Sequence, residues 1–129
     1  MLVVDCSSAI AWLMPDERNV DLRHLSMTHG PFIAPFLFWS ELRNVILTNE
    51  RRGRLTINAA EGMIAAIDAF KMDLDTAPSN TNVLAIARKH RLTVYDALYL
   101  DLAMRKSAAL TTLDAALSRA ATLEGLTLA

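Results

Sequence analysis

The sequence predicts a three-layer α/β fold, in which a mostly parallel sheet of four to five short strands is flanked by helices on both faces. Short apolar runs alternate with longer segments of helical periodicity, which is the order in which parallel sheets are built. The composition favours helices, because Ala and Leu each occur 20 times in 129 residues while aromatic residues make up 6%. We expect one domain spanning 1–129, since domains cluster near this length.

In the first half of the chain, turn and cap residues separate the apolar runs. Leu2-Val3-Val4 is a short β-favouring run, after which Ser7 or Ser8 can cap a helix. Pro15-Asp16-Glu17 is expected to end that helix, and Gly30-Pro31 the next one. The predicted elements are strand 2–4, helix 9–14, helix 20–29, strand 32–34, helix 37–52 and helix 57–70.

The second half continues the alternation. Met72 to Asp75 is a weak strand because it contains two acids, and Thr93-Val-Tyr-Asp96 has the spacing of a capping box that opens a helix. Gly125 precedes a last apolar run. The predicted elements are strand 72–75, helix 80–90, helix 93–105, strand 108–111, helix 115–123 and strand 126–128.

The charge balance and the single cysteine exclude several classes of protein. The 13 Lys and Arg against 14 Asp and Glu exclude a histone-like protein that binds nucleic acid by bulk charge, but not a local basic patch. Cys6 alone excludes an internal disulfide framework and fits a reducing compartment. Asp5 interrupts an N-terminus that has no basic n-region, so no signal peptide is expected. The uncharged stretch 30–40 is shorter than the ~20 residues of a membrane helix. We expect a cytoplasmic protein with no membrane segment.

Two candidate site residues lie just after predicted strands. Ligands of parallel α/β sheets bind beyond the carboxyl ends of the strands, where the strand order reverses. Asp5 closes the first strand, and Asp114 follows the penultimate one. Both also have a structural explanation, because Asp is a common helix N-cap.

Two further acids lie on predicted helices. At about 100° per residue, Leu37 and Val45 each lie about 40° from Glu41, which places this carboxylate on the apolar side of its helix. Burying it unpaired would be costly, so it should meet a cation, a donor or a cleft. Asp96 is the acid of the predicted capping box and needs no further role to explain it. Asp101 is interpreted as a solvated partner of Arg105 at i+4 and is left out of the site.

Periodicity does not show whether Asp5, Glu41, Asp96 and Asp114 meet. If they do, they need a counter-charge, because like charges raise each other's pKa. A hard divalent cation such as Mg²⁺ or Mn²⁺ prefers oxygen ligands, and such a site serves phosphodiester hydrolysis.

Other chemistries lack the residues they need. The three histidines form no HxxxH pair, and one Cys cannot supply a zinc ribbon. The four Gly do not cluster into a phosphate loop. Cys6 has no His near it in sequence and is better explained as a small apolar residue.

Nine of the 13 cations fall into three groups, which lie on the long predicted helix and its end, before the helix that carries Asp96, and at the end of that helix. Such groups can hold a polyanion near an acidic centre, and they equally suit the dipoles of helix C-termini, so both explanations stay open. The groups are Arg43, Arg51, Arg52 and Arg54; Arg88, Lys89 and Arg91; and Arg105 and Lys106.

Three segments resemble the PIN-domain family, especially its VapC-type toxin ribonucleases. VVDCSSAIAWLMPDE resembles the family's opening strand with its Asp-x-Ser, and PFLFWSELRNVI resembles the segment with the family's glutamate. LTVYDALYLDLAMRKSAALTTLDAAL is similar to the helix with Thr-x-Tyr-Asp-Ala-x-Tyr and the Thr-x-Asp that follows a strand. The four acids of these motifs fall on Asp5, Glu41, Asp96 and Asp114.

The resemblance implies a PIN-like domain that cleaves RNA with Mg²⁺ or Mn²⁺, forms a homodimer and is inhibited by a small antitoxin. It makes the four acids the catalytic and metal-binding residues, with Ser7 and Thr112 as hydroxyls that orient carboxylates. Among the basic groups, we expect RNA contacts from Arg43, Arg51 and Arg52.

Two alternatives remain beside this metal-dependent endoribonuclease. A non-catalytic, partner-binding α/β module would use the same acids as helix caps. A phosphoacceptor receiver-like domain is less favoured, because it needs adjacent acids after the first strand and a Lys after a late one. Here Asp5 stands alone, and the last predicted strand ends in Leu-Thr-Leu-Ala.

Overall fold

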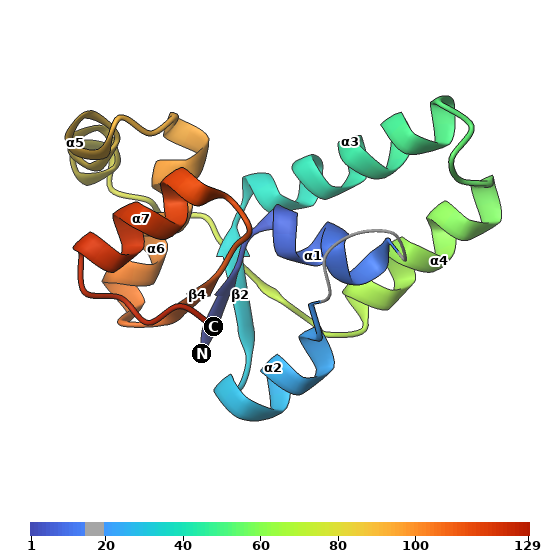
Figure 1. Ribbon diagram of the computed structural model, residues 1–129, viewed down its shortest axis with the longest axis horizontal. Coiled ribbons are helices and arrows are strands. Elements are labelled where there is room, and N and C mark those ends of the chain that lie inside the picture. The colour runs from blue at the N-terminus through green and yellow to red at the C-terminus, as the bar shows by residue number, and fades with distance from the viewer. Residues whose placement is uncertain (15–19) are drawn as a thin grey trace.

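The computed structural model describes residues 1–14 and 20–129, which form the three layers that the sequence predicts (Figure 1). The predicted helix end at Pro15-Asp16-Glu17 lies outside the described residues. In chain order the elements are β1 (Leu2–Val4), α1 (Cys6–Leu13), α2 (Leu22–His29), β2 (Phe32–Pro35), α3 (Leu37–Arg51), α4 (Ile57–Asp68), β3 (Asp73–Asp75), α5 (Asn80–His90), α6 (Val94–Lys106), β4 (Ala109–Thr111) and α7 (Ala115–Leu123).

The sheet of the described chain is four-stranded and parallel, in the order β3-β2-β1-β4. β1 lies in the interior of the sheet, pairing Val3 with Ile33 of β2 on one side and with Leu110 of β4 on the other. All three β1 side chains are fully buried. The chain adds β2 and β3 on one side of β1 and returns to place β4 on the other side. The strand order therefore reverses between β1 and β4, where parallel sheets bind ligands.

Helices cover the two faces of this sheet. α5, α6 and α7 lie on one side and α1 to α4 on the other (Figure 1). α6 packs against β1, β2 and β4 and is itself contacted by α5 and α7, so every residue from Ala97 to Ala103 is buried. No helix in the described part of the chain combines the length and apolarity needed to cross a membrane.

The fifth predicted strand, 126–128, does not form. Leu128 makes a single parallel bridge with Leu110 at the outer edge of β4. Two backbone bonds hold the segment there, from Leu110 N to the Thr127 carbonyl at 3.0 Å and from Ala129 N to the Leu110 carbonyl at 2.9 Å. Its side chains from Thr127 onward stay exposed, so little apolar burial offsets the entropy of ordering a longer strand.

The first helix begins earlier than predicted. α1 starts at Cys6 instead of 9, and Ser7 and Ser8 lie inside it instead of capping it. Their hydroxyls have partners elsewhere: Ser8 Oγ lies 3.0 Å from Thr111 Oγ1, and Ser7 Oγ donates to Asp5. Tertiary contacts with the end of β4 thus replace the local capping bonds that the sequence suggests.

Candidate active site

A cavity of about 500 Å³ opens at the carboxyl ends of β1 and β4. Each of the four acids singled out in the sequence lines it. Asp5 comes from the end of β1, Glu41 from α3, Asp96 from the first turn of α6 and Asp114 from the residue before α7. Its other lining residues are Cys6, Ser7, Ile10, Val45 and Leu113.

Asp5 is the most enclosed of these carboxylates, with 5% of its surface exposed. Its Oδ2 accepts hydrogen bonds from Thr112 Oγ1 at 2.6 Å and from Ser7 Oγ at 2.8 Å. Burial raises the pKa of Asp5, the two hydroxyl bonds oppose that rise, and the charge of Asp114 adds to it. Asp5 occupies the N-cap position of α1, but its side chain makes no capping bond. The capping explanation therefore does not account for this carboxylate.

The hydroxyls of Ser7 and Thr112 each bond in two directions. Ser7 Oγ accepts from Leu113 N at 2.9 Å, and Thr112 Oγ1 accepts from Asp114 N at 3.0 Å. A hydroxyl has one proton, and in both cases it goes to Asp5. The backbone amides thus orient the two hydroxyls, and the hydroxyls orient the carboxylate.

Asp114 caps a helix and lines the cavity at once. Its Oδ1 accepts from Leu117 N at 2.8 Å, the N-cap bond that the sequence allowed as a structural explanation. The cap fixes the position of this side chain at the cavity wall, so the two roles are compatible.

Glu41 receives a donor that sequence reasoning did not identify. The hydroxyl of Tyr99, which is fully buried, donates to Glu41 Oε1 at 2.7 Å. Burial raises the pKa of Glu41, the Tyr99 bond lowers it, and the charges of Asp5 and Asp96 raise it further. The signal available in the sequence was spacing, because Tyr99 lies three residues after Asp96 and so near it on the same helix.

Asp96 lines the cavity from the first turn of α6. Burial raises its pKa, and the nearby charges of Asp114 and Asp5 raise it further, while the Thr93 hydroxyl lowers it. Thr93 caps α6 as predicted, with its Oγ1 accepting from Asp96 N at 3.1 Å. The cap bond uses the backbone of Asp96 and leaves its carboxylate facing the cavity.

No cation of the described residues pairs with these four carboxylates. The ion pairs of Lys, Arg and His there go to other acids, namely Asp68, Asp75, Asp101 and Glu124. Burial, and to a smaller extent the charges of the neighbouring acids, raises the pKa values of Asp5, Glu41 and Asp96. The cavity is thus a concentration of negative charge that its surroundings do not compensate.

The donor set fits a hydrated, hard divalent cation. Within the described chain, no group of three or more His, Cys, Asp or Glu side chains stands arranged to enclose a metal ion directly. Mg²⁺ does not need such a cage, because it keeps several waters and binds through one or two carboxylates. The cavity offers oxygen donors and room for water molecules.

The family model described as the PIN domain matches residues 2–123 of the chain. The chain belongs to the PIN-domain family. It is 32% identical to ribonuclease VapC3 of Pyrobaculum aerophilum in an alignment of 116 residues, and the match covers 88% of this chain and 88% of the relative. Its fold is also similar to the crystal structure of PAE2754 from Pyrobaculum aerophilum, with a TM-score of 0.73 and 22% identity over 92% of this chain and 83% of the other.

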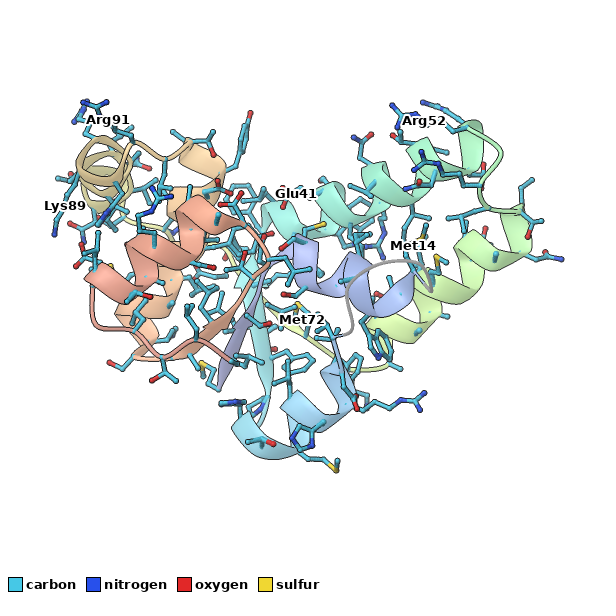
Figure 2. All side chains as sticks on the ribbon, in the orientation of Figure 1. Met14, Glu41, Arg52, Met72, Lys89 and Arg91 are labelled. Atoms are coloured by element: carbon cyan, nitrogen blue, oxygen red, sulfur yellow. The ribbon has the colours of Figure 1, made fainter. Side chains whose placement is uncertain are left out.

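The cations predicted to contact RNA lie away from the cavity of this PIN domain. Arg43 is held 3.5 Å from Asp68 and stacks over the ring of Trp39 at 4.1 Å. Arg51 and Arg52 are exposed at the far end of α3, about 15 Å along the helix from Glu41. Figure 2 shows Arg52 and Glu41 near opposite ends of α3.

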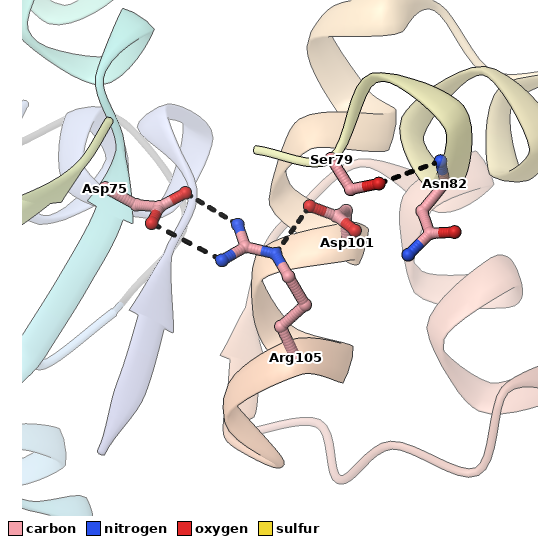
Figure 3. Close-up of polar contacts among 5 residues, drawn as sticks. All are labelled: Asp75, Ser79, Asn82, Asp101 and Arg105. Atoms are coloured by element: carbon pink, nitrogen blue, oxygen red, sulfur yellow. Dashed lines mark hydrogen bonds and ion pairs between the residues drawn. The ribbon is translucent and has the colours of Figure 1, made fainter. Parts of the chain in front are cut away.

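The predicted solvation of Asp101 is wrong, although its pairing with Arg105 is confirmed. Asp101 is 1% exposed, and its Oδ2 accepts from Arg105 Nε at 2.8 Å. Arg105 Nη2 also donates to Asp75 Oδ2 at 2.6 Å, which links α6 to β3 (Figure 3). The burial of Asp101 results from tertiary packing. The sheet, α5 and α7 all pack against α6 and cover helix faces that periodicity alone predicts to be exposed to solvent. Asp101 does not line the carboxylate cavity.

Cys6 also lines the cavity wall. Burial raises the pKa of its thiol, with the charges of Glu41 and Asp5 adding to the rise, so the reactive thiolate is disfavoured. This agrees with its interpretation as a small apolar residue.

Proposed function

We propose that this PIN domain is a divalent-metal-dependent endoribonuclease that hydrolyses RNA phosphodiesters at the cavity of Asp5, Glu41, Asp96 and Asp114. The observation that carries the proposal is the meeting of four carboxylates in one cavity with no described cation paired to them. The likeness to a protein named ribonuclease VapC3 supports the choice of RNA as substrate.

Mg²⁺ or Mn²⁺ is the proposed cofactor. Asp5 and Asp96 are the first choices as direct ligands, with Glu41 and Asp114 acting directly or through water. When bound, such an ion activates a water for in-line attack and stabilises charge on the phosphate oxygens. A bound cation also offsets the repulsion that raises the pKa of Asp5, Glu41 and Asp96.

The surrounding residues hold the carboxylates in place before substrate arrives. Ser7 and Thr112 fix Asp5, the N-cap bond of α7 fixes Asp114, and Tyr99 fixes one oxygen of Glu41. Such supporting bonds preserve the orientation of ligands, and their loss usually costs 10–100-fold in metal affinity or activity.

The test is cleavage of a structured RNA with Mn²⁺ or Mg²⁺ by the wild type and by Asp5→Asn and Asp96→Asn. We expect each substitution to lower the cleavage rate by at least about 100-fold, since changes to supporting residues alone reach that level. Glu61→Gln is the matched control, because Glu61 is an exposed acid on α4 outside the cavity. Full activity in both variants, or undiminished cleavage in excess chelator, would contradict the proposal.

The non-catalytic alternative has one observation in its favour, the helix cap made by Asp114. Calorimetric titration with Mn²⁺ separates the two functions. A partner-binding module whose acids act only as caps should show no saturable binding, whereas a metal site should bind Mn²⁺ saturably and lose that binding in Asp5→Asn.

The biological setting follows from the family resemblance and from the name of the relative. We propose a cytoplasmic toxin whose inhibitor is a small antitoxin, acting as a homodimer, with Arg43, Arg51 and Arg52 contacting the RNA backbone. Light scattering of the purified chain tests the dimer. Weaker RNA binding with a smaller salt dependence in Arg51→Ala and Arg52→Ala tests the backbone contacts.

A further inference from the structure

A second cavity lies between α5 and α6 and shares no lining residue with the carboxylate cavity of the proposed active site. We refer to it as the α5–α6 cavity. Its volume is about 360 Å³, which lies in the range of small-molecule sites, roughly 300–1,000 Å³. Its lining residues, all from these two helices, are Asn82, Ala85, Ile86, Asp101, Met104 and Arg105.

Asp101 brings a buried carboxylate to this cavity. Its side chain is 2% exposed, and its Oδ2 accepts from Arg105 Nε at 2.8 Å. Its other oxygen, Oδ1, accepts no hydrogen bond from any described residue, and Figure 3 shows it turned away from Arg105. Every fully buried side-chain nitrogen or oxygen of the described chain has a hydrogen-bond partner, so Oδ1 is open to the cavity that Asp101 lines.

The ion cluster around Asp101 has an excess of negative charge. Arg105 pairs with both Asp101 and Asp75, whose side chain is 12% exposed. No other cation of the described residues pairs with either acid. One guanidinium therefore faces two carboxylates, and one negative charge in largely buried surroundings stays uncompensated. A cation that reaches Asp101 Oδ1 would complete the pairing.

The other lining side chains suit a short aliphatic body that ends in a hydrogen-bond donor. Ala85, Ile86 and Met104 form an apolar wall, and the flexible thioether of Met104 adapts to ligands of different shape. The side-chain amide of Asn82 makes no hydrogen bond within the described chain, because its bond with Ser79 uses the backbone nitrogen. The amide oxygen of Asn82 is therefore available as a second acceptor beside Asp101.

A primary ammonium matches this arrangement better than a guanidinium does. A guanidinium binds a carboxylate best through two parallel hydrogen bonds, but Asp101 Oδ2 is already bonded to Arg105. An ammonium is a compact charge with three donors and needs no paired acceptors. We propose that the α5–α6 cavity binds the ammonium group of a primary alkylamine, with Asp101 Oδ1 and the Asn82 amide oxygen as acceptors. This site stands independently of the proposed ribonuclease function.

The test follows the isoleucine methyl resonances of the full chain by NMR while butylamine is added. Ile86 lines the α5–α6 cavity, and Ile10 lines the carboxylate cavity, which also attracts cations. Ile57, 66% exposed on α4, reports non-specific effects. Three further probes are compared with butylamine. Butanol has a similar shape without the charge, butylguanidine carries a planar cation, and a lysine capped at both ends carries the ammonium on a peptide unit.

We expect butylamine to shift the Ile86 resonance saturably and to bind at least about 10-fold more tightly than butanol, and also more tightly than butylguanidine. Asp101→Asn should raise the Kd at Ile86 by about 10-fold or more, and Asn82→Ala by about 2- to 10-fold. Asp73→Asn is the matched control, because Asp73 is an exposed acid of β3 outside the cavity, and it should bind butylamine as the wild type does.

The capped lysine identifies the source of the ammonium. Tighter binding of butylamine than of the capped lysine indicates a free amine, because the peptide unit then adds nothing or clashes. Tighter binding of the capped lysine indicates a side chain of another protein. Both results support an ammonium site at Asp101.

The proposal is overturned if Ile86 shows no saturable shift, if butanol binds as tightly as butylamine, or if Asp101→Asn and Asn82→Ala keep the wild-type Kd. A shift at Ile10 alone would place the amine in the carboxylate cavity instead. An Ile86 resonance that changes with protein concentration in the absence of amine would mean that a second copy of the chain covers the cavity, which also contradicts the proposal. If Asp101→Asn does not fold, Asn82→Ala decides, because Asn82 is exposed and its truncation should leave the fold intact.

Discussion

At the scale of single residues, the environment of Asp5 combines two opposing effects. Burial favours the neutral acid, whereas the Thr112 and Ser7 hydroxyls favour the carboxylate, and burial is the larger effect on its pKa. Keeping Asp5 charged therefore costs folding free energy in the absence of a counter-ion. Such a cost is typical of functional sites, where activity and stability conflict.

This conflict predicts a pH-dependent gain in stability for Asp5→Asn without metal. The pKa of Asp5 is raised on folding, so the folded state binds the Asp5 proton more tightly than the unfolded state does. The free energy of unfolding therefore falls as the pH rises from 3.8, the ordinary pKa of Asp, through the raised pKa of the folded state. In chelator at pH 7 we expect Asp5→Asn to melt about 2–5 °C above the wild type. The difference should shrink as pH falls toward 4. A lower melting temperature for the variant at pH 7 would contradict this account.

A second prediction concerns the support of Glu41. Tyr99→Phe keeps the buried ring and removes the hydroxyl that donates to Glu41 Oε1. We expect cleavage to fall by about 10-fold or more, while the free energy of unfolding changes by only about 1 kcal/mol. The effects of Tyr99→Phe and Glu41→Gln on kcat should not add, because both act through one bond. Additive losses in the double variant would show that Tyr99 acts by another route.

At the scale of elements, α6 links the site to the rest of the fold. It carries Asp96 and Tyr99 toward the cavity, and Asp101 and Arg105 toward β3. Asp75 of β3 accepts from Arg105 with its side chain and from Phe36 N, at the start of α3, with its carbonyl at 2.9 Å. The ion cluster therefore joins the two helices that supply Glu41 and Asp96.

Removing the arginine of this cluster should be costly. Arg105→Met leaves Asp101 buried without its cation, and we expect a loss of about 2–3 kcal/mol in the free energy of unfolding, discounted because Arg105 is 26% exposed. Lys106→Met, which removes the adjacent exposed cation, should cost less than about 0.5 kcal/mol. Urea unfolding of both variants measures the difference, and equal stabilities would mean that the cluster contributes nothing.

At the scale of the whole molecule, the strand order assembles the site. β1 and β4 are far apart in the chain but adjacent in the sheet, so Asp5 and Asp114 meet at the point where the order reverses. The formal net charge of −1 does not reveal this separation of charges, in which four acids lie in the cavity and most of the grouped cations lie at helix ends.

Metal binding should stabilise the whole fold through this charge. A ligand that binds only the folded state adds about 2.7 kcal/mol at 100 times its Kd, so the melting temperature should rise with Mn²⁺ or Mg²⁺ and return to its starting value in chelator. Asp96→Asn should lose most of this rise, and NaCl at equal ionic strength should not reproduce it. If Mn²⁺ does not change the melting temperature of the wild type, the result would argue against a metal site.

Local sequence signals predicted most elements, because caps and periodicity act over a few residues. Thr93 caps α6 as its spacing indicates, and helices 80–90 and 115–123 have the predicted bounds. The sequence-based predictions are wrong where contacts with distant segments of the chain determine the local structure. The start of α1 depends on the hydroxyl partners of Ser7 and Ser8, the burial of Asp101 depends on how α6 packs, and 126–128 lacks the burial that a strand requires.

The sequence by itself determined the order of elements, the fold class and which acids to consider, since these follow from local propensity, periodicity and recognisable motifs. Only the tertiary structure decided that Asp5, Glu41, Asp96 and Asp114 share one cavity, that Tyr99 supports Glu41 and that Asp101 lines a second cavity. The physical reason is that pKa shifts, burial and hydrogen bonds between remote residues arise from distances in space, which strand order and helix packing set.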